Sequence, residues 1–117
     1  MWLFTETGFI SAVCDPKDKN TMAVRARDKQ SLAELSEMFD AEILELPKRD
    51  YPYRVIITKK NLTEWMVKSI ADAQYTNFKS RIYQTRGEQF EHALHDVWAV
   101  MHKVTDTAKA KARSLYY

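Results

Sequence analysis

Hydrophobic and polar residues alternate along the first half of the chain with the two-residue period of a β-strand. The apolar runs at 2–4 and 9–14 flank a short polar segment, which predicts an N-terminal β-hairpin. Residues 21–27 alternate strictly, so that one face is apolar and the other carries Arg25 and Arg27. The chain is therefore expected to begin with three strands.

Two further strands and three helices are predicted beyond residue 27. Residues 42–46 and 53–58 have strand character, and 53–58 (YRVIIT) is the richest in β-branched and aromatic residues. Residues 74–86, rich in aromatic and basic side chains, are interpreted as a loop. Three pairs with capping-box spacing, each before an apolar run of helical period, predict helix starts: Ser31 with Glu34, Asn61 with Glu64, and Thr85 with Glu88.

This order of elements predicts an α+β fold with an antiparallel sheet. It contains most of a ferredoxin-like split βαβ unit, to which the N-terminal hairpin adds the missing strand and an additional C-terminal helix follows. We expect residues 1–104 to form a single α+β domain and 105–117 a basic C-terminal tail or helix extension. The sheet face without helices should be exposed or covered by a second subunit, which favours a homo-oligomer.

Length and composition exclude several classes of site. The chain has 117 residues, enough for one ordinary domain. Its two glycines cannot build a Gly-rich phosphate loop. The single cysteine, Cys14, excludes an internal disulfide and a Cys-clustered zinc site, and its place at the end of an apolar run predicts that it is buried.

Charge and hydropathy indicate where the protein acts. No apolar stretch approaches the roughly 20 residues that span a bilayer, and the first residues lack the basic region of a signal peptide. We therefore expect a cytoplasmic protein without a membrane partner. The net charge of +2 is small for a dedicated DNA-binding domain, so nucleic acid is not the expected partner. Binding of nucleic acid through the basic tail is the alternative.

Three arginines are the most informative charged residues. Arg25 and Arg27 share one face of a predicted strand, and Arg54 lies on a strand that a split βαβ unit places next to it. Guanidinium groups bind phosphate through paired hydrogen bonds, so their convergence predicts a phosphate site. The alternative is a solvated face on which the arginines pair with acidic residues.

Two segments interleave aromatic rings with basic and amide groups. Residues 49–54 (RDYPYR) and 75–81 (YTNFKSR) have the composition of sites that hold a nucleobase and its phosphate. Such rings also anchor loops, which is the alternative. The residues expected to contribute are Tyr51, Tyr53, Tyr75 and Phe78 as stacking rings, with Asn77 and Lys79 as polar groups.

The histidines do not form a convincing metal or catalytic site. Glu91 and His95 are four residues apart on a predicted helix and close enough to bond, but His102 lies two turns, ~10 Å, from His95. No pair of carboxylates and no nucleophile motif is evident. The sequence implies no metal and no cofactor, and His95 is interpreted as a boundary residue or a donor to a ligand.

Several short motifs together resemble a small protein family of bacteria and phages. The match spans about residues 1–103, and its motifs are WLFT at 2–5, GF at 8–9 with Ser11 and Val13, VRAR at 24–27, DY at 50–51 with YR at 53–54, Tyr75 with NFK at 77–79, and ALHDVW at 93–98 with VM at 100–101. Phage members of this kind resemble sponges that sequester the cyclic-nucleotide signals of antiviral systems without cleaving them.

The resemblance implies a non-catalytic binding protein for a nucleotide-like ligand. It would place Arg25, Arg27, Tyr53, Arg54, Asn77, Lys79 and His95 at the pocket. Two alternatives stay open beside it. One is a regulatory module that binds a host protein, and the other is an enzyme that uses His95 with Glu91 or Asp96.

Overall fold

The computed structural model describes residues 1–106, which fall into two compact units. The sheet unit comprises Met1–Phe78, and the helical unit begins at Lys79. The predicted tail at 105–117 lies, from residue 107 on, outside the described residues, and the single domain over 1–104 stays a prediction. No helix among the described residues is long and apolar enough to cross a membrane.

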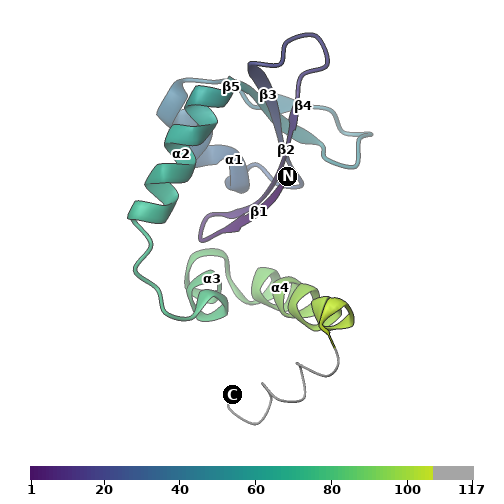
Figure 1. The fold of residues 1–117 in the computed structure, drawn as a ribbon, viewed down its shortest axis with the longest axis vertical. Coiled ribbons are helices and arrows are strands. Elements are labelled where there is room, and N and C mark those ends of the chain that lie inside the picture. The colour runs from purple at the N-terminus through teal and green to yellow at the C-terminus, as the bar shows by residue number, and fades with distance from the viewer. Residues whose placement is uncertain (107–117) are drawn as a thin grey trace. The chain divides into compact units, whose positions relative to one another are not determined.

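The sheet unit is built on one antiparallel five-stranded sheet (Figure 1). The strand order is β1-β2-β3-β5-β4, and every neighbouring pair is antiparallel. The strands are β1 Trp2–Thr5, β2 Gly8–Cys14, β3 Thr21–Ala26, β4 Leu44–Glu45 and β5 Tyr53–Thr58. The predicted N-terminal hairpin is confirmed as β1 and β2.

The ferredoxin-like split βαβ arrangement is also confirmed. Helix α1 (Gln30–Phe39) joins β3 to β4. Strand β5 lies between these two strands in the sheet and pairs with each of them. Helix α2 (Lys59–Ala71) follows β5. Strand β2 pairs with the other edge of β3, so the hairpin supplies the strand that the split unit lacks.

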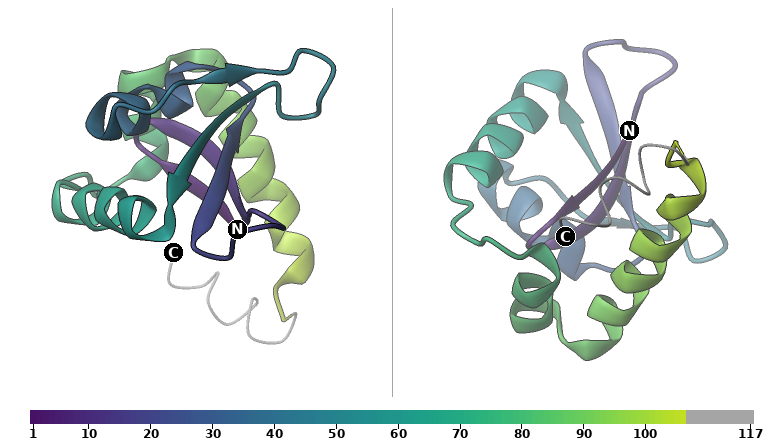
Figure 2. Two further views of the ribbon diagram at one scale, coloured as in Figure 1. Left: turned by 90° about the horizontal axis from the view of Figure 1, so that it is seen from above. Right: turned by 60° about the horizontal axis from the view of Figure 1, so that its bottom comes forward.

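The core of the sheet unit lies between one sheet face and both of its helices. Helices α1 and α2 lie on the same side of the sheet (Figures 1 and 2). Alternate residues of β3 and β5 point to this side, as the period of two requires. The buried residues are Ile10 and Ala12 from β2, Met22, Val24 and Ala26 from β3, Val55 and Ile57 from β5, Leu32 and Leu35 from α1, and Leu62 and Trp65 from α2. Each large side chain contributes about 1.5–3 kcal/mol by burial.

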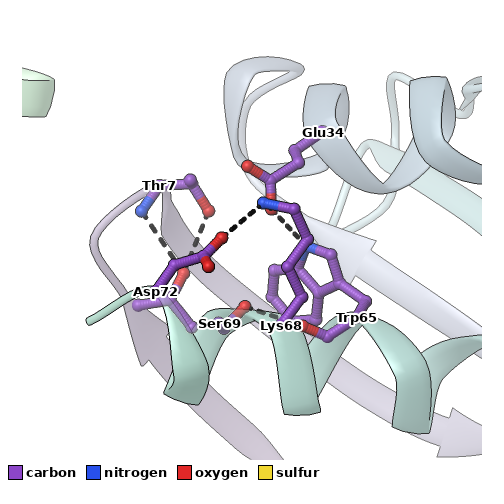
Figure 3. Close-up of polar contacts among 7 residues, drawn as sticks. Thr7, Glu34, Trp65, Lys68, Ser69 and Asp72 are labelled. Atoms are coloured by element: carbon purple, nitrogen blue, oxygen red, sulfur yellow. Dashed lines mark hydrogen bonds and ion pairs between the residues drawn. The ribbon is translucent and has the colours of Figure 1, made fainter.

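A polar contact joins the two helices at the edge of this core (Figure 3). The indole Nε1 of Trp65 donates to Glu34 Oε1 at 3.0 Å, and the Lys68 ammonium lies 3.8 Å from the same oxygen. Lys68 also donates to Asp72 at 2.8 Å. This hydrogen bond, with the charge of Glu34 second, raises the pKa of Lys68 above its usual value. The buried indole therefore has a partner for its donor.

The three predicted capping boxes are wrong, although helices begin near each of them. At α1, the carboxylate of Asp28 accepts the hydrogen bond of the Ser31 backbone N–H at 2.8 Å. Ser31 itself lies inside the helix, buried, and its hydroxyl accepts from the Phe9 backbone N–H at 3.2 Å. The serine is thus used to attach α1 to β2 instead of capping the helix.

Helix α2 begins earlier than its box predicts. The hydroxyl of Thr58 accepts from the Asn61 backbone N–H at 3.1 Å, so Thr58 is the N-cap and Asn61 lies in the first turn.

Cys14, predicted to be buried, is exposed because it is the last residue of β2 and adjoins a polar turn.

The helical unit corrects the predicted loop over 74–86. Helix α3 (Phe78–Arg86) occupies most of it, and α4 (Glu88–Met101) and a 3₁₀ turn (His102–Val104) follow. Thr85 is therefore inside α3, where its hydroxyl donates to the Arg81 carbonyl at 3.2 Å. Gly87 separates the helices with φ of +86°, a conformation that other residues rarely adopt.

The apolar positions of the helical unit are only partly buried. Ile82 of α3 and Leu94 of α4 are buried. The remaining apolar residues toward the end of α4 are exposed: Val97, Trp98, Val100 and Met101, with Val104 in the 3₁₀ turn. The structure confirms the predicted helix as α4. These apolar residues are nevertheless exposed, unlike those of a helix that packs on a core.

Candidate phosphate site on the sheet

Strand register brings five side chains into one row across the sheet, the last of them Leu44, which pairs with Arg54. Trp2 pairs with Ser11, Ser11 with Arg25, and Arg25 with Arg54. Directly opposite residues of antiparallel strands point to the same face. Because Val24 and Ala26 point to the helices, this row lies on the other face of the sheet, which we call the arginine face.

Arg25 is held in place by its neighbours in the row. Its Nη2 donates to Ser11 Oγ at 2.7 Å, and its Nε lies 3.5 Å from the Ser11 carbonyl oxygen. Ser11 is fully buried, so this hydrogen bond satisfies a hydroxyl that water does not reach. The guanidinium also lies 4.7 Å from the centre of the Tyr51 ring.

Arg27 reaches the same tyrosine from just beyond the end of β3. Its guanidinium lies 4.6 Å from the centre of the Tyr51 ring and 3.1 Å from the Asp50 carboxylate. The Tyr51 side chain is only 7% exposed, although it comes from a loop. Tyr51 therefore aligns two guanidinium groups through cation–π contacts, and its ring has little surface left for a base.

Arg54 differs from the other two arginines in having an unsatisfied donor. Its Nε is buried and has no hydrogen-bond partner among residues 1–106. Its opposite neighbour is Arg25, at a Cα separation that antiparallel pairing sets at about 4.5–5.5 Å. Two residues of like charge thus lie directly opposite each other on neighbouring strands, an arrangement that an anion would stabilise.

Tyr53 lies on the opposite face of the sheet from these arginines. It pairs with Ala26 and packs against the helix-covered core. The Lys29 ammonium lies 5.8 Å from its ring centre and forms an ion pair with Glu45. The hydrogen bond that Lys29 donates to Glu45, and then the negative charge of Glu45, raise the pKa of Lys29 above its usual value. The sheet separates Tyr53 from Arg25 and Arg54.

The other predicted residues form two further groups. At the end of the sheet unit, the rings of Tyr75 and Phe78 lie 5.5 Å apart, and Asn77, which lies between them in sequence, is exposed. In the helical unit, Lys79 Nζ lies 3.3 Å from His95 Nδ1 and 4.7 Å from the Trp98 ring centre.

The predicted contact between Glu91 and His95 is not formed. The carboxylate of Glu91 lies 3.8 Å from His92 Nε2, while the ring of His95 lies 5.4 Å from that of Trp98. Residues 1–106 contain no group of three His, Cys, Asp or Glu side chains that could hold a metal ion.

Sequence reasoning missed Ser11, Trp2 and Phe9 as members of the arginine face. Each lies at an alternate position of its strand that points to this face, but the sequence position indicates the shared face only when the pairing of β1, β2 and β3 is known. The sequence singled out Arg25 and Arg54 because they are charged. The serine and the two rings carry no such signal.

Comparison with known proteins identifies no relative: no family, no curated protein and no solved structure matches the chain.

Proposed function

We propose that the protein binds a phosphate-bearing, nucleotide-like small molecule on the arginine face and does not turn it over. One observation carries the proposal: Arg25 and Arg54 lie directly opposite each other, and the buried Nε of Arg54 has no partner among the described residues. Leaving a buried donor unpaired costs about 1–3 kcal/mol. A phosphate oxygen would remove that cost once the Arg54 side chain turns its Nε toward the ligand, and it would offset the unfavourable pairing of two like charges.

The surrounding contacts support phosphate over other anions. Arg25 and Arg27 are aligned on Tyr51, so their planar groups are oriented before a ligand arrives. The ion pair of Arg27 with Asp50 is exposed on both sides and worth little, so Arg27 can exchange Asp50 for a ligand oxygen. Three guanidinium groups exceed what a single carboxylate needs and suit a phosphodiester or polyphosphate.

Binding without turnover is favoured by the contacts of the candidate acid–base group. His95 is paired with Lys79 and not with a carboxylate that could orient it as a base. The resemblance to phage proteins extends the proposal to the ligand. A cyclic nucleotide, sequestered intact in the cytoplasm, would combine phosphodiesters for the arginines with bases for aromatic side chains.

Calorimetry with cyclic di- and trinucleotides and with mononucleotides tests the proposal. Replacing Arg54 or Arg25 by glutamine should weaken binding about 10- to 150-fold, since each removes a charge-assisted hydrogen bond of about 1.5–3 kcal/mol. Arg49→Gln is the matched control, because Arg49 is an exposed arginine of the neighbouring turn. Equal affinities for all three variants and the unaltered protein, or no binding at all, would reject the arginine site.

Turnover is tested separately by recovering the ligand. After incubation and denaturation, mass spectrometry should return the nucleotide with its original mass. Release of a linear or dephosphorylated product would show an enzyme. A nucleotide that co-purifies with the protein from cells would identify the ligand directly.

A second candidate function, binding to a protein, rests on the exposed apolar end of α4. Val97, Trp98, Val100 and Met101 expose hydrophobic surface that monomers commonly bury against a partner. A second copy of the chain would make the homo-oligomer expected from the sequence. Light scattering during gel filtration measures the mass, and Val97→Glu should reduce an oligomer to monomers.

A further inference from the structure

An exposed tryptophan begins a chain of aromatic contacts that leads across the arginine face. Trp2 on β1 is 69% exposed and meets the Phe9 ring edge-on, with centres 5.9 Å apart and planes at 87°. Phe9 stacks on Phe4 at 4.5 Å and lies 6.4 Å from Tyr51. The rings thus connect a large exposed indole to the tyrosine that aligns Arg25 and Arg27.

The backbone around Trp2 is fixed on both sides. The ammonium group of Met1 donates to the Ala12 carbonyl at 2.9 Å, and the Ala12 N–H donates to the Met1 carbonyl at 2.8 Å. Trp2 itself pairs with Ser11 in the β1–β2 ladder. The indole therefore stands on an ordered strand and keeps its exposed surface at little entropic cost to a ligand.

The spacing between the indole and the arginines matches a ligand with two chemically different ends. Neighbouring strands lie about 4.8 Å apart, so the backbone of Trp2 on β1 is about 10 Å from that of Arg25 on β3. The long arginine side chains shorten the gap to a bound group. A flat aromatic ring at one end and a phosphate at the other are what a nucleotide presents.

We propose that Trp2 is the base-stacking platform of the arginine site, and that the ligand carries a nucleobase which lies on the exposed indole while Arg25 and Arg54 hold its phosphate. The inference rests on the proposed phosphate site. It adds a subsite and a residue outside the aromatic segments that the sequence indicated, and it gives the base a place that buried Tyr51 cannot offer.

Paired ligands and paired variants test the subsite. Adenosine monophosphate and cyclic di-AMP carry the base, and ribose 5-phosphate has the phosphate without it. Trp2→Ala should weaken binding of the adenine ligands about 5- to 150-fold and leave ribose 5-phosphate unchanged, because stacking on an aromatic side chain supplies the difference. Trp2→Phe keeps a ring and should retain most of the affinity.

Trp98 provides the matched control in the helical unit. It is also an exposed tryptophan, so Trp98→Ala should leave the affinity for adenine ligands unchanged. Fluorescence gives a second readout, since stacking quenches an indole. In the Trp98→Phe variant only Trp2 and buried Trp65 emit, and adenine ligands, but not ribose 5-phosphate, should quench the exposed component.

Each outcome decides between the two proposals. If Trp2→Ala binds adenine ligands as tightly as the unaltered protein, or if Trp98→Ala is the variant that loses affinity, the platform at Trp2 is wrong and the phosphate site stands. If neither adenine ligands nor ribose 5-phosphate bind at all, both proposals fail. Oligoadenylate that binds more tightly than cyclic di-AMP, with an affinity that falls steeply with salt, would identify single-stranded nucleic acid as the source of the base.

Discussion

Arg25 and Arg54 are neighbours of the same residue type, yet their replacement should change stability in opposite directions. Methionine is a suitable substitute at both positions, because it keeps an unbranched stem of similar length and removes the charge. The two arginines differ in their partners: Arg25 donates to buried Ser11 Oγ at 2.7 Å, whereas the buried Nε of Arg54 has no partner among the described residues.

The sizes of the two effects follow from these contacts. Arg25→Met leaves the Ser11 hydroxyl buried without its donor, which costs about 1–3 kcal/mol, and loses the contact with Tyr51, worth about 0.5–1 kcal/mol. Arg54→Met removes an unsatisfied donor and one of two like charges on directly opposite residues. Since Arg54 is only partly buried, we expect the lower end of the same range, a gain of about 1 kcal/mol.

Thermal and urea unfolding measure both changes. A gain of about 1 kcal/mol corresponds to a rise of roughly 4 °C in Tm for a chain of this size, and Arg25→Met should lower Tm by at least as much. Both variants should lose affinity for the phosphate ligand. A fall in Tm for Arg54→Met comparable to that of Arg25→Met would refute the reasoning, because it would mean that Arg54 stabilises the fold and is not held in reserve for an anion.

Two further predictions concern local hydrogen bonds. Thr58→Ala should destabilise the protein by about 1 kcal/mol in urea unfolding, because it removes the N-cap of α2. Asn61→Ala, at the position that the sequence indicated as the cap, should have a much smaller effect. Equal losses of stability in the two variants would contradict the cap assignment. Hydrogen bonds from Asn20 and Thr21 lower the pKa of Asp18, so its ionised form stabilises the fold above the unfolded value of about 3.9 and that stabilisation is lost as the pH falls through the folded value. Asp18→Asn should therefore lower Tm at neutral pH, and its difference from the unaltered protein should shrink below about pH 4; a difference independent of pH would exclude Asp18 as its source.

Local patterns were sufficient for most of the elements and for part of the site. Strict alternation in 21–27 and the β-branched and aromatic residues of 53–58 identified both central strands, and the period of two placed Arg25 and Arg54 away from the apolar residues that form the core. The pairing of those strands followed from the order of elements, since a split βαβ unit makes them neighbours. The prediction of a loop over 74–86 was wrong because α3 has no clear apolar period, and Ile82 is its only buried residue.

The starts of the helices show why sequence spacing alone does not identify the capping residue. Ser31 with Glu34 satisfies the spacing of a capping box, but Ser31 is buried and its hydroxyl is bonded to Phe9, a residue 22 positions away in sequence. Asp28, one turn earlier and in contact with solvent, accepts the helix N–H instead. A polar group that is buried takes whichever partner the packing offers, and sequence spacing does not record that partner.

The sequence by itself determined which residues form strands and which faces are apolar, because a period of two assigns each side chain to one side of a strand whatever the partner strands are. Only the tertiary structure decided that Trp2, Ser11, Arg25 and Arg54 share one row, that Tyr51 contacts two guanidinium groups and that Tyr53 lies on the other face. The physical reason is register: side chains from strands far apart in sequence meet only after hydrogen bonding has fixed the alignment of each strand with the next.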